Sequence, residues 1–366
     1  MKAAADEKEG IIKIQEEKEM KKSLNFVGFI SLMLTIVMLT ACGGKTDKTD
    51  NNSSNNITDT QTTGSAKQTP ESEQKAVSEP LNPTPGSVTI GDVTLSAEFI
   101  KLDKPIQVST QSRPFMAVFG DIVYIGDGDK VVKKYTLTDN ALTLVKEMNI
   151  PNSSGIAVDG KGQLYANGGV FAAKIYDGNG NQVGEAAEKG NISISQTEDF
   201  ALTYFSGRDA ITKISSGTAS QWVISGLSSN DPSQIKGPFN KIAAIEVVGN
   251  HALVAGLIEN EQKLVVFDTA GNELIRSSEK LFGNGISAMT ETANGYITAS
   301  VSTIHLIKKD GTFIGKSDST KPLFGVEEAV WLKKFVPMAD GSVLALCGAK
   351  RADGNAEALL YRIKGF

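Results

Sequence analysis

Short apolar runs alternate with polar turns along most of the chain, from about residue 113 onward. In the clearest unit, residues 155–183, an apolar run, a glycine turn and a second apolar run come first. A loop, a third run, a turn of Asp, Gly and Asn residues and a polar segment follow. Short runs bracketed by such turns are typical of antiparallel β-strands. The pattern therefore predicts units of four short strands.

The unit recurs along the chain. We count about six copies at spacings of roughly 36 to 50 residues, the range of four-stranded propeller blades. The turns at 177–180, 268–272 and 309–311 fall at the same place in their copies. We therefore predict an all-β fold, a six-bladed β-propeller of four-stranded antiparallel blades. The copies cover residues 115–135, 155–183, 192–223, 242–275, 286–314 and 335–363.

The last copy ends at Phe366 without its fourth strand. A propeller with an open blade would expose an unpaired sheet edge, so the ring needs a strand from elsewhere. Residues 87–95 or 97–102 precede the first copy and have strand character. We expect one of these N-terminal strands to close the ring. A pair of β-sandwiches, or a seven-bladed ring that uses residues 87–112 as a fragment, are the alternative architectures.

The repeats are similar to those of NHL-type and YncE-like six-bladed propellers, over about residues 113–366. Because the individual copies are degenerate, the resemblance is to an architecture and not to a characterised enzyme family. Related propellers of the lactonase type hold calcium in the central channel through Glu, Asn and Asp residues from different blades. We therefore consider two alternatives, a propeller without a cofactor and, as the resemblance implies, a propeller with a calcium ion in its channel.

The N-terminal region has the features of a secretory signal. Residues 26–41 are mostly apolar, follow a lysine-rich stretch and end in small residues. The sequence Leu39-Thr40-Ala41-Cys42 resembles the lipobox of bacterial lipoproteins. The resemblance implies cleavage before Cys42 and a diacylglyceryl group on its thiol, and two acyl chains suffice for stable anchoring. A transmembrane anchor, or a cleaved signal with an incidental cysteine, are the alternatives.

The segment after Cys42 is polar and almost without large apolar side chains up to about residue 85. Such a segment cannot offset its ordering entropy by burial, so we predict a disordered tether. The expected organisation is a signal peptide at 1–41, the lipidated cysteine and tether at 42–86, and the propeller at 87–366. Residues 1–19 lie upstream of Met20, which is an alternative start. We expect a cell-membrane location with the propeller outside the cytoplasm, at the cell surface or in the periplasm.

Composition narrows the function classes. The chain is 40% hydrophobic and has a formal net charge of −5, so a sizeable core is expected and a basic nucleic-acid footprint is not. With Cys42 lipidated, Cys347 is left alone in an apolar run, where a cysteine is usually a small buried hydrophobe.

No catalytic constellation is recognisable. The two histidines, His251 and His305, are too few for a three-histidine zinc site. Nucleophile elbows, P-loops and HExxH motifs are absent from the sequence. The loop at 126–129 could attract a cation, but Asp-Gly pairs are more often hairpin turns. We predict no cofactor, with calcium as the alternative.

The remaining candidates are loop residues on one face of the ring, since loops on a rigid scaffold often carry recognition. We expect a non-catalytic scaffold that binds a protein, a polar small molecule or a glycan, attached to the membrane and without affinity for nucleic acid. The alternative is a calcium-dependent lactonase-type hydrolase or lyase with its site in the channel. The candidate ligand-binding residues are Asp127, Asp129, Arg208, Asp231, Glu259, Trp331 and Arg351.

Overall fold

The structure is a computed structural model, and the part of the chain that it describes begins at Leu81. The predicted signal peptide, Cys42, the tether up to residue 80, Arg208 and Asp231 lie outside the described residues. The described residues all belong to one compact unit, Lys75–Phe366. None of their helices is long and apolar enough to span a membrane. The described ranges are 81–108, 114–166, 168–205, 210–222, 238–239, 241–281, 285–300, 302–326, 330–351 and 354–366.

Four of the sheets are four-stranded, and each is built from strands that follow one another in sequence. The first contains β8 (Ile156–Val158), β9 (Leu164–Ala166), β10 (Ala172–Tyr176) and β11 (Gln182–Lys189). The second contains β12 (Asn191–Ile194), β13 (Ala201–Phe205), β14 (Ala210–Ser215) and β15 (Thr218–Gln221). The third contains β16 (Lys241–Val248), β17 (His251–Ile258), β18 (Glu261–Phe267) and β19 (Glu273–Arg276). The fourth contains β20 (Ala288–Glu291), β21 (Gly295–Ser300), β22 (Thr303–Lys308) and β23 (Phe313–Lys316).

A larger sheet joins the two ends of the chain. Its main path runs β24-β25-β26-β2-β7-β6-β5-β4, so the N-terminal strand β2 lies between C-terminal and N-terminal strands. Strand β2 pairs antiparallel with β26 from Ser96 to Ile100, and parallel with β7 at Lys101 and Leu102. Strands β1 (Ser87–Ile90) and β3 (Ile106–Val108) pair with β2 and β26. The remaining members are β2 (Val93–Leu102), β4 (Phe115–Phe119), β5 (Ile122–Gly126), β6 (Val131–Thr138), β7 (Ala141–Asn149), β24 (Val330–Pro337), β25 (Val343–Lys350) and β26 (Ala356–Lys364).

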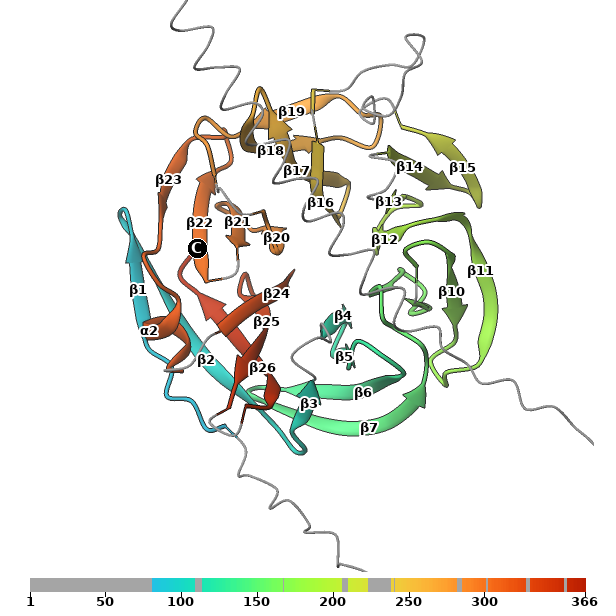
Figure 1. Cartoon of the computed structure of the whole chain (residues 1–366), viewed down its shortest axis with the longest axis horizontal. Coiled ribbons are helices and arrows are strands. Elements are labelled where there is room, and N and C mark those ends of the chain that lie inside the picture. Colours follow the sequence, from blue (N-terminus) through green and yellow to red (C-terminus); the bar gives the residue numbers. More distant parts are fainter. Residues whose placement is uncertain are drawn as a thin grey trace, which may run out of the picture. The chain divides into compact units, whose positions relative to one another are not determined.

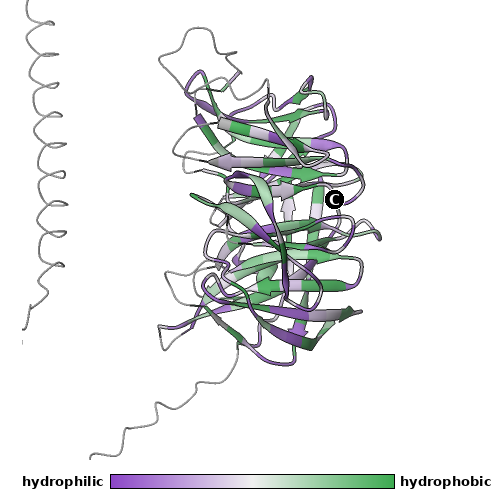
Figure 2. Ribbon diagram, turned by 90° about the vertical axis from the view of Figure 1, so that its right-hand side faces the viewer, coloured by the Kyte–Doolittle hydropathy of each residue, from purple (hydrophilic) through white to green (hydrophobic). Residues whose placement is uncertain are grey.

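The sheets are arranged around a central channel, and the fold is an all-β propeller (Figure 1). The innermost strands contact one another in the cyclic order β4, β8, β12, β16, β20, β24 and back to β4. Apolar clusters fill the space between neighbouring sheets, and the side view shows hydrophobic segments within the strands (Figure 2). One short helix, α2 (Lys321–Phe324), packs against β1 and β2.

One turn explains why the repeat was visible in the sequence. In the β10–β11 turn, Asp177 Oδ1 accepts the backbone N–H groups of Asn179 and Asn181, and Oδ2 accepts the Asn181 amide at 2.9 Å. Asp268 and Asn272 repeat these contacts between β18 and β19. These hydrogen bonds hold the pKa of both aspartates below the usual value. A shared Asp-x-x-Gly-Asn pattern is therefore a requirement of one hairpin geometry.

Lysine side chains link neighbouring sheets through the same turns. Lys134 Nζ of β6 donates to the carbonyl oxygen of Gly178 at 3.2 Å, and Lys146 Nζ of β7 to that of Asn179 at 2.9 Å. In the same way Lys213 Nζ of β14 donates to Thr269 O at 2.8 Å. Each contact joins one sheet to the third-to-fourth-strand turn of a neighbouring sheet.

Cys347 and His305 are both packed in the protein interior. Cys347 on β25 is fully buried, as predicted, and burial raises the pKa of its thiol. His305 on β22 is also fully buried, with its ring edge-on to Phe313 at a centroid distance of 5.6 Å. Burial, assisted by the charge of Lys316, lowers the pKa of His305 to about 3. The imidazole is therefore neutral in the folded protein over the physiological range.

Candidate binding site in the central channel

The central channel contains two connected cavities lined by the innermost strands. One, of about 440 Å³, is formed by residues at the start of these strands and by the loops that lead into them. The other, of about 200 Å³, is formed by residues nearer the strand ends. Both volumes together fall in the range of small-molecule sites. The residues that line both cavities are Met116, Ile156, Ser193, Glu246 and Lys334.

A β-bulge places two consecutive lysines in the wall of the larger cavity. The register of β24 with β25 shifts between Leu332 and Lys334, which leaves Lys333 as the extra residue. In a regular strand, neighbouring side chains point to opposite faces, whereas a bulge brings two to the same side. Lys333 and Lys334 accordingly both line the larger cavity. Strand β16 has a similar shift after Ile242.

The second of these lysines, Lys334, is paired with a carboxylate across the channel wall. Lys334 Nζ forms an ion pair with Glu246 Oε2 of β16, and the side chains are 25% and 16% exposed. Ser193 Oγ of β12 donates to Glu246 Oε1 at 3.2 Å and accepts the backbone N–H of Val247 at 2.8 Å. The network therefore ties together strands from three sheets. Since both the hydroxyl proton and an oxygen lone pair of Ser193 are engaged, its role in this network is to position Glu246.

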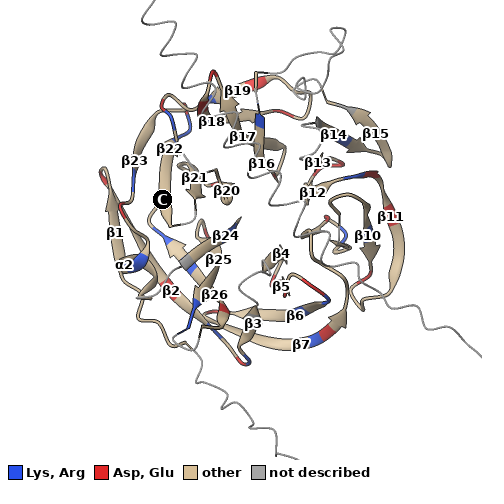
Figure 3. Cartoon of the chain, in the orientation of Figure 1, with Lys and Arg blue, Asp and Glu red and all other residues tan. Residues whose placement is uncertain are grey.

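The charge of this wall differs in sign from that of the chain. Among the described residues that line the two cavities, the charged ones are Lys333, Lys334 and Glu246, a formal balance of +1. The chain as a whole carries −5. Figure 3 shows the basic segment of β24 on the channel side of its sheet.

The predicted loop residue Asp127 organises its own loop. Its Oδ1 accepts the backbone N–H groups of Asp129, Lys130 and Val131 at 2.8 to 3.1 Å and the amide of buried Asn152 at 3.2 Å. Asp129 contributes its carbonyl oxygen to the backbone N–H of Asn152 at 2.9 Å. These contacts account for the Gly126–Asp129 pattern without a ligand, and a binding role for the two aspartates stays a prediction.

The other described candidates are spread over three places. Glu259 occupies the β17–β18 hairpin turn with a φ of 51°, next to Asn260 at 67°. Trp331, expected in a loop, lies within strand β24 and packs against the apolar cluster of Ile100. Arg351 is 4% exposed and forms an ion pair with buried Glu357 at 3.4 Å. The structure does not bring these residues together in the channel cavities, and a role for them in binding stays a prediction.

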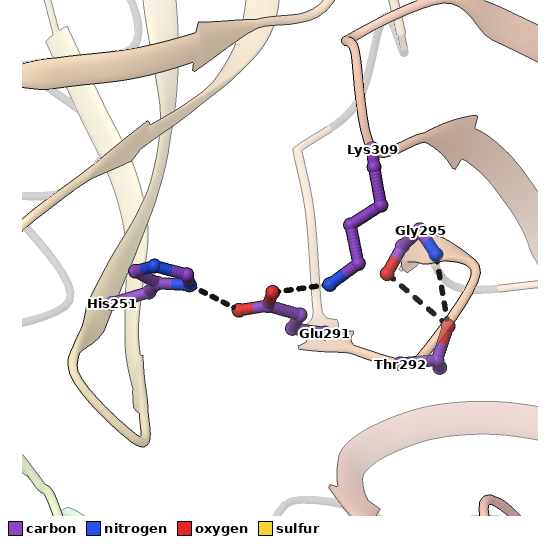
Figure 4. A network of polar contacts seen from close by, with 5 residues as sticks. All are labelled: His251, Glu291, Thr292, Gly295 and Lys309. Atoms are coloured by element: carbon purple, nitrogen blue, oxygen red, sulfur yellow. Dashed lines mark hydrogen bonds and ion pairs between the residues drawn. The ribbon is translucent and has the colours of Figure 1, made fainter.

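The larger cavity lies where the innermost strands begin, and a second polar network lies near their other ends (Figure 4). Glu291, at the end of β20, places Oε2 2.7 Å from His251 Nδ1 and pairs through Oε1 with Lys309. This network crosses from the β16–β19 sheet to the β20–β23 sheet. His251 and Glu291 also line a cavity of about 420 Å³ next to Pro337 and Met338. Within the described ranges, no group of three or more His, Cys, Asp or Glu side chains is placed to hold a metal ion.

The channel residues Ser193, Glu246, Lys333 and Lys334 were missed in the sequence. The sequence predicts a loop at Trp331, whereas β24 begins at Val330 and continues across two lysines that interrupt its apolar run. Glu246 is similarly the one acidic residue in an apolar strand, Lys241–Val248. A charged residue inside an innermost strand could have indicated the site. Such a strand faces either the core or the channel, and a charged side chain is expected on the channel side.

Comparison with known proteins identifies no family for this chain, and the solved structures that match it have low similarity. No family model matches the chain, and no curated protein matches it. Among solved structures, the WD40 β-propeller domain of Doa1 matches with a TM-score of 0.46 and 11% identity, over 76% of this chain and 96% of that one. The C-terminal WD40 domain of Sif2 matches with a TM-score of 0.44 and 10% identity, over 72% and 98%. The assignment as a propeller rests on the strand order and the ring of innermost strands described above.

Proposed function

We propose that this protein is a cell-envelope lipoprotein, anchored through Cys42, whose propeller is a non-catalytic scaffold that binds a ligand in the central channel. The observation that carries the binding role is the ion-paired cluster of Lys334 and Glu246, with Lys333 beside it, in an otherwise mostly apolar cavity. Buried or partly buried charges are costly in a channel wall, so their presence favours a role in recognition.

The proposed propeller has six blades of the NHL-like type. In this interpretation the ten-stranded sheet counts as two blades, β4 to β7 and β24 to β26 with β2. Strand β2 then supplies the outer strand of the last blade and closes the ring, which the pairing of Ser96–Ile100 with β26 supports. Closure by a strand from the other end of the chain removes two exposed sheet edges at once.

The proposed anchor rests on the lipobox Leu39–Cys42 and the apolar run before it. A flexible tether over residues 42–86 would have a root-mean-square reach of roughly 40 Å. That reach would hold the propeller clear of lipid headgroups while keeping it at the membrane. The proposed location is the outer side of a cell membrane, at the cell surface or in the periplasm.

The lactonase-type alternative needs a calcium ion in the channel. Among the described lining residues of the two cavities, Glu246 is the carboxylate and Asn191 the asparagine. Calcium prefers six to eight oxygen ligands. Since Glu246 is already paired with Lys334, calcium would have to displace that lysine. Calcium therefore enters the test below as a competing ligand.

The test is a thermal-shift screen of the full chain in nanodiscs, against neutral and charged metabolites, glycans, peptides and calcium. A channel-blocking variant, Ala243→Trp, identifies ligands of the channel, because Ala243 lines the larger cavity. The matched control is Val145→Trp on the outer strand β7, where Val145 is 56% exposed. A ligand at a hundredfold over its Kd adds about 2.7 kcal/mol of stability, which is several degrees in Tm.

We expect a ligand that raises Tm in the parent chain and in the Val145→Trp variant but not in Ala243→Trp. A ligand whose shift survives in Ala243→Trp would move the site out of the channel. A shift by calcium together with turnover of a lactone would replace the scaffold by the hydrolase.

A further inference from the structure

We infer that the propeller docks on the lipid bilayer through residues 168–171, between β9 and β10, with the face that holds the larger cavity turned toward the membrane. This inference rests on the proposed function, because it gives an orientation to a propeller anchored through Cys42. It follows from two exposed apolar side chains on these residues, here called the apolar loop, and from the place where the chain enters the propeller.

Val170 and Phe171 form the exposed tip of the apolar loop. Five large apolar side chains of the described residues are exposed, and these two are the most exposed of them, at 58% and 66%. The backbone beneath them is packed, since Gly168 is buried and the N–H of Gly190 donates to the carbonyl oxygen of Phe171 at 3.4 Å. The loop is therefore held against the β11–β12 connection while its two apolar side chains lie in water. Apolar surface in water is unfavourable, so a partner that covers it is stabilising.

The apolar loop lies on the face of the ring that holds the larger cavity. Ile156, at the start of β8, lines that cavity and pairs with Ala166 at the end of β9. The loop comes shortly after Ala166, and its Gly168 also lines the larger cavity. The exposed tip is therefore placed at the end of the channel where the innermost strands begin.

The chain enters the propeller at the same face. Lys334, near the start of β24, lines the larger cavity, and the start of β24 pairs with the end of β25, beside which β26 begins. Leu81, the first described residue, donates its backbone N–H to Oε2 of Glu357, near the start of β26, at 3.1 Å. A tether from Cys42 would thus reach the propeller on the face that carries the apolar loop.

A lipid surface fits the apolar loop better than other occupants do. The segment between Cys42 and residue 80 contains two large apolar residues, Ile57 and Val77, so it has little with which to cover the loop. A stable dimer buries about 800 Å² on each partner, far more than two side chains offer. A bilayer interface needs no matched shape, and an inserted apolar side chain adds a second attachment to that of the acyl chains. The tether by itself leaves the propeller clear of the headgroups, and the loop is the contact that brings this face to them.

The experiment places a polarity-sensitive, thiol-reactive fluorophore on the loop of the full chain, reconstituted in vesicles of phosphatidylcholine with a minor share of phosphatidylglycerol. Val170→Cys provides the thiol, since Cys347 is fully buried and Cys42 would carry its lipid. The matched control is Val183→Cys on β11, where Val183 is 53% exposed. It lies at the opposite end of the same sheet, because β11 begins where β10 ends, with Gln182 opposite Tyr176.

We expect the label at Val170→Cys to emit at shorter wavelength on vesicles than the label at Val183→Cys. A lipid with its quencher near the headgroup should quench it more than one with the quencher at the end of an acyl chain, since interfacial groups lie about 5 to 10 Å deep. Adding Phe171→Asp to Val170→Cys should remove both effects, because a carboxylate is costly to bury in an apolar environment. Adding Phe171→Leu, which keeps an apolar side chain, should preserve them.

Equal emission from the labels at the two positions would overturn the inference and leave the anchor in place. A shift to shorter wavelength that grows with the ratio of protein to lipid would also overturn it, because a second copy of the chain would then cover the loop. If the parent chain takes up the label at Cys42, that thiol carries no lipid, and the proposed anchor fails together with the orientation that depends on it.

Discussion

Glu246 and Lys334 form their ion pair between β16 and β24, strands whose sheets are not neighbours in the ring but are separated by the sheet of β20. The contact therefore spans part of the channel wall. Both side chains are largely buried there, with 16% of the Glu246 side chain and 25% of the Lys334 side chain exposed. An ion pair in such a place is strongly dependent on both partners, because either charge left alone is poorly solvated.

We predict that Lys334→Met destabilises the protein by about 1 to 3 kcal/mol, because it leaves the Glu246 carboxylate without its counter-charge. Adding Glu246→Gln should recover most of that loss. The measurement is a double-mutant cycle from urea unfolding of the parent, the two single variants and the double variant.

The exposed pair Glu98–Lys364 is the matched control, with an oxygen-to-nitrogen distance of 2.7 Å and exposures of 39% and 46%. Its coupling energy should be below about 0.5 kcal/mol, as is usual for solvated pairs. A channel coupling no larger than this control would show that solvent screens Glu246 and Lys334 fully.

Contacts between neighbouring sheets should contribute measurably to stability. Lys213 Nζ donates to Thr269 O at 2.8 Å and lies 5.5 Å from the centre of the Phe200 ring. We predict that Lys213→Met lowers the free energy of unfolding by about 1 kcal/mol, through loss of one charge-assisted hydrogen bond and one cation–π contact. The measurement is urea unfolding, with exposed Lys280→Met as the reference variant. The same loss in both variants would assign the effect to net charge and not to the contact.

Glycine at position 325 is required for two separate reasons. It ends α2 with a φ of 62°, and a Cβ there would stand 1.9 Å from the carbonyl oxygen of Thr84. We predict that Gly325→Ala destabilises the protein by about 2 kcal/mol or more and loosens the segment before β1, since strain and overlap add. Thermal unfolding and the rate of proteolysis near residue 84 measure the two effects.

Gly120→Ala separates the two reasons. Gly120 has a φ of 60°, but no atom lies within 4 Å of the place where its Cβ would stand. Its substitution should therefore cost only the strain of the left-handed backbone, about 1 kcal/mol. If both variants lose the same stability, the contact with Thr84 relaxes without cost.

The repeated strands could be predicted from the sequence because their causes are local. The turn at Asp177 needs an aspartate, a glycine and an asparagine at fixed offsets, and it recurs at Asp268. Strand β7 (Ala141–Asn149) is absent from the predicted first copy. Most of its side chains are exposed, because an outer strand has one face in water, and its apolar residues are interspersed with polar ones.

The channel site could not be predicted, because its causes are not local. Whether Lys333 faces the channel depends on a register shift between β24 and β25, and a shift by one residue moves every side chain to the other face. The pairing of Lys334 with Glu246 depends in turn on the closure of the ring. A prediction that looks for binding residues in loops therefore overlooks charged residues on the innermost strands.

The buried histidine should make stability depend on pH in the acid range. Burial lowers the pKa of His305 to about 3, whereas an unfolded chain would titrate it near 6.5. Below about pH 6.5 the unfolded state takes up a proton that the folded state refuses, so the contribution of neutral His305 is complete above that pH and is lost progressively down to about pH 3.

We predict that the difference in unfolding free energy between the parent and His305→Gln shrinks on acidification, with a slope of at most about 1.4 kcal/mol per pH unit. Urea unfolding at a series of pH values from 7.5 to 4 measures it, and His251→Gln is the control because His251 is paired with Glu291 near the surface. If the parent and His305→Gln lose stability in parallel, His305 takes up its proton in the folded protein. The acid sensitivity would then belong to carboxylates such as Asp268, whose lowered pKa also makes stability fall on acidification, but at lower pH.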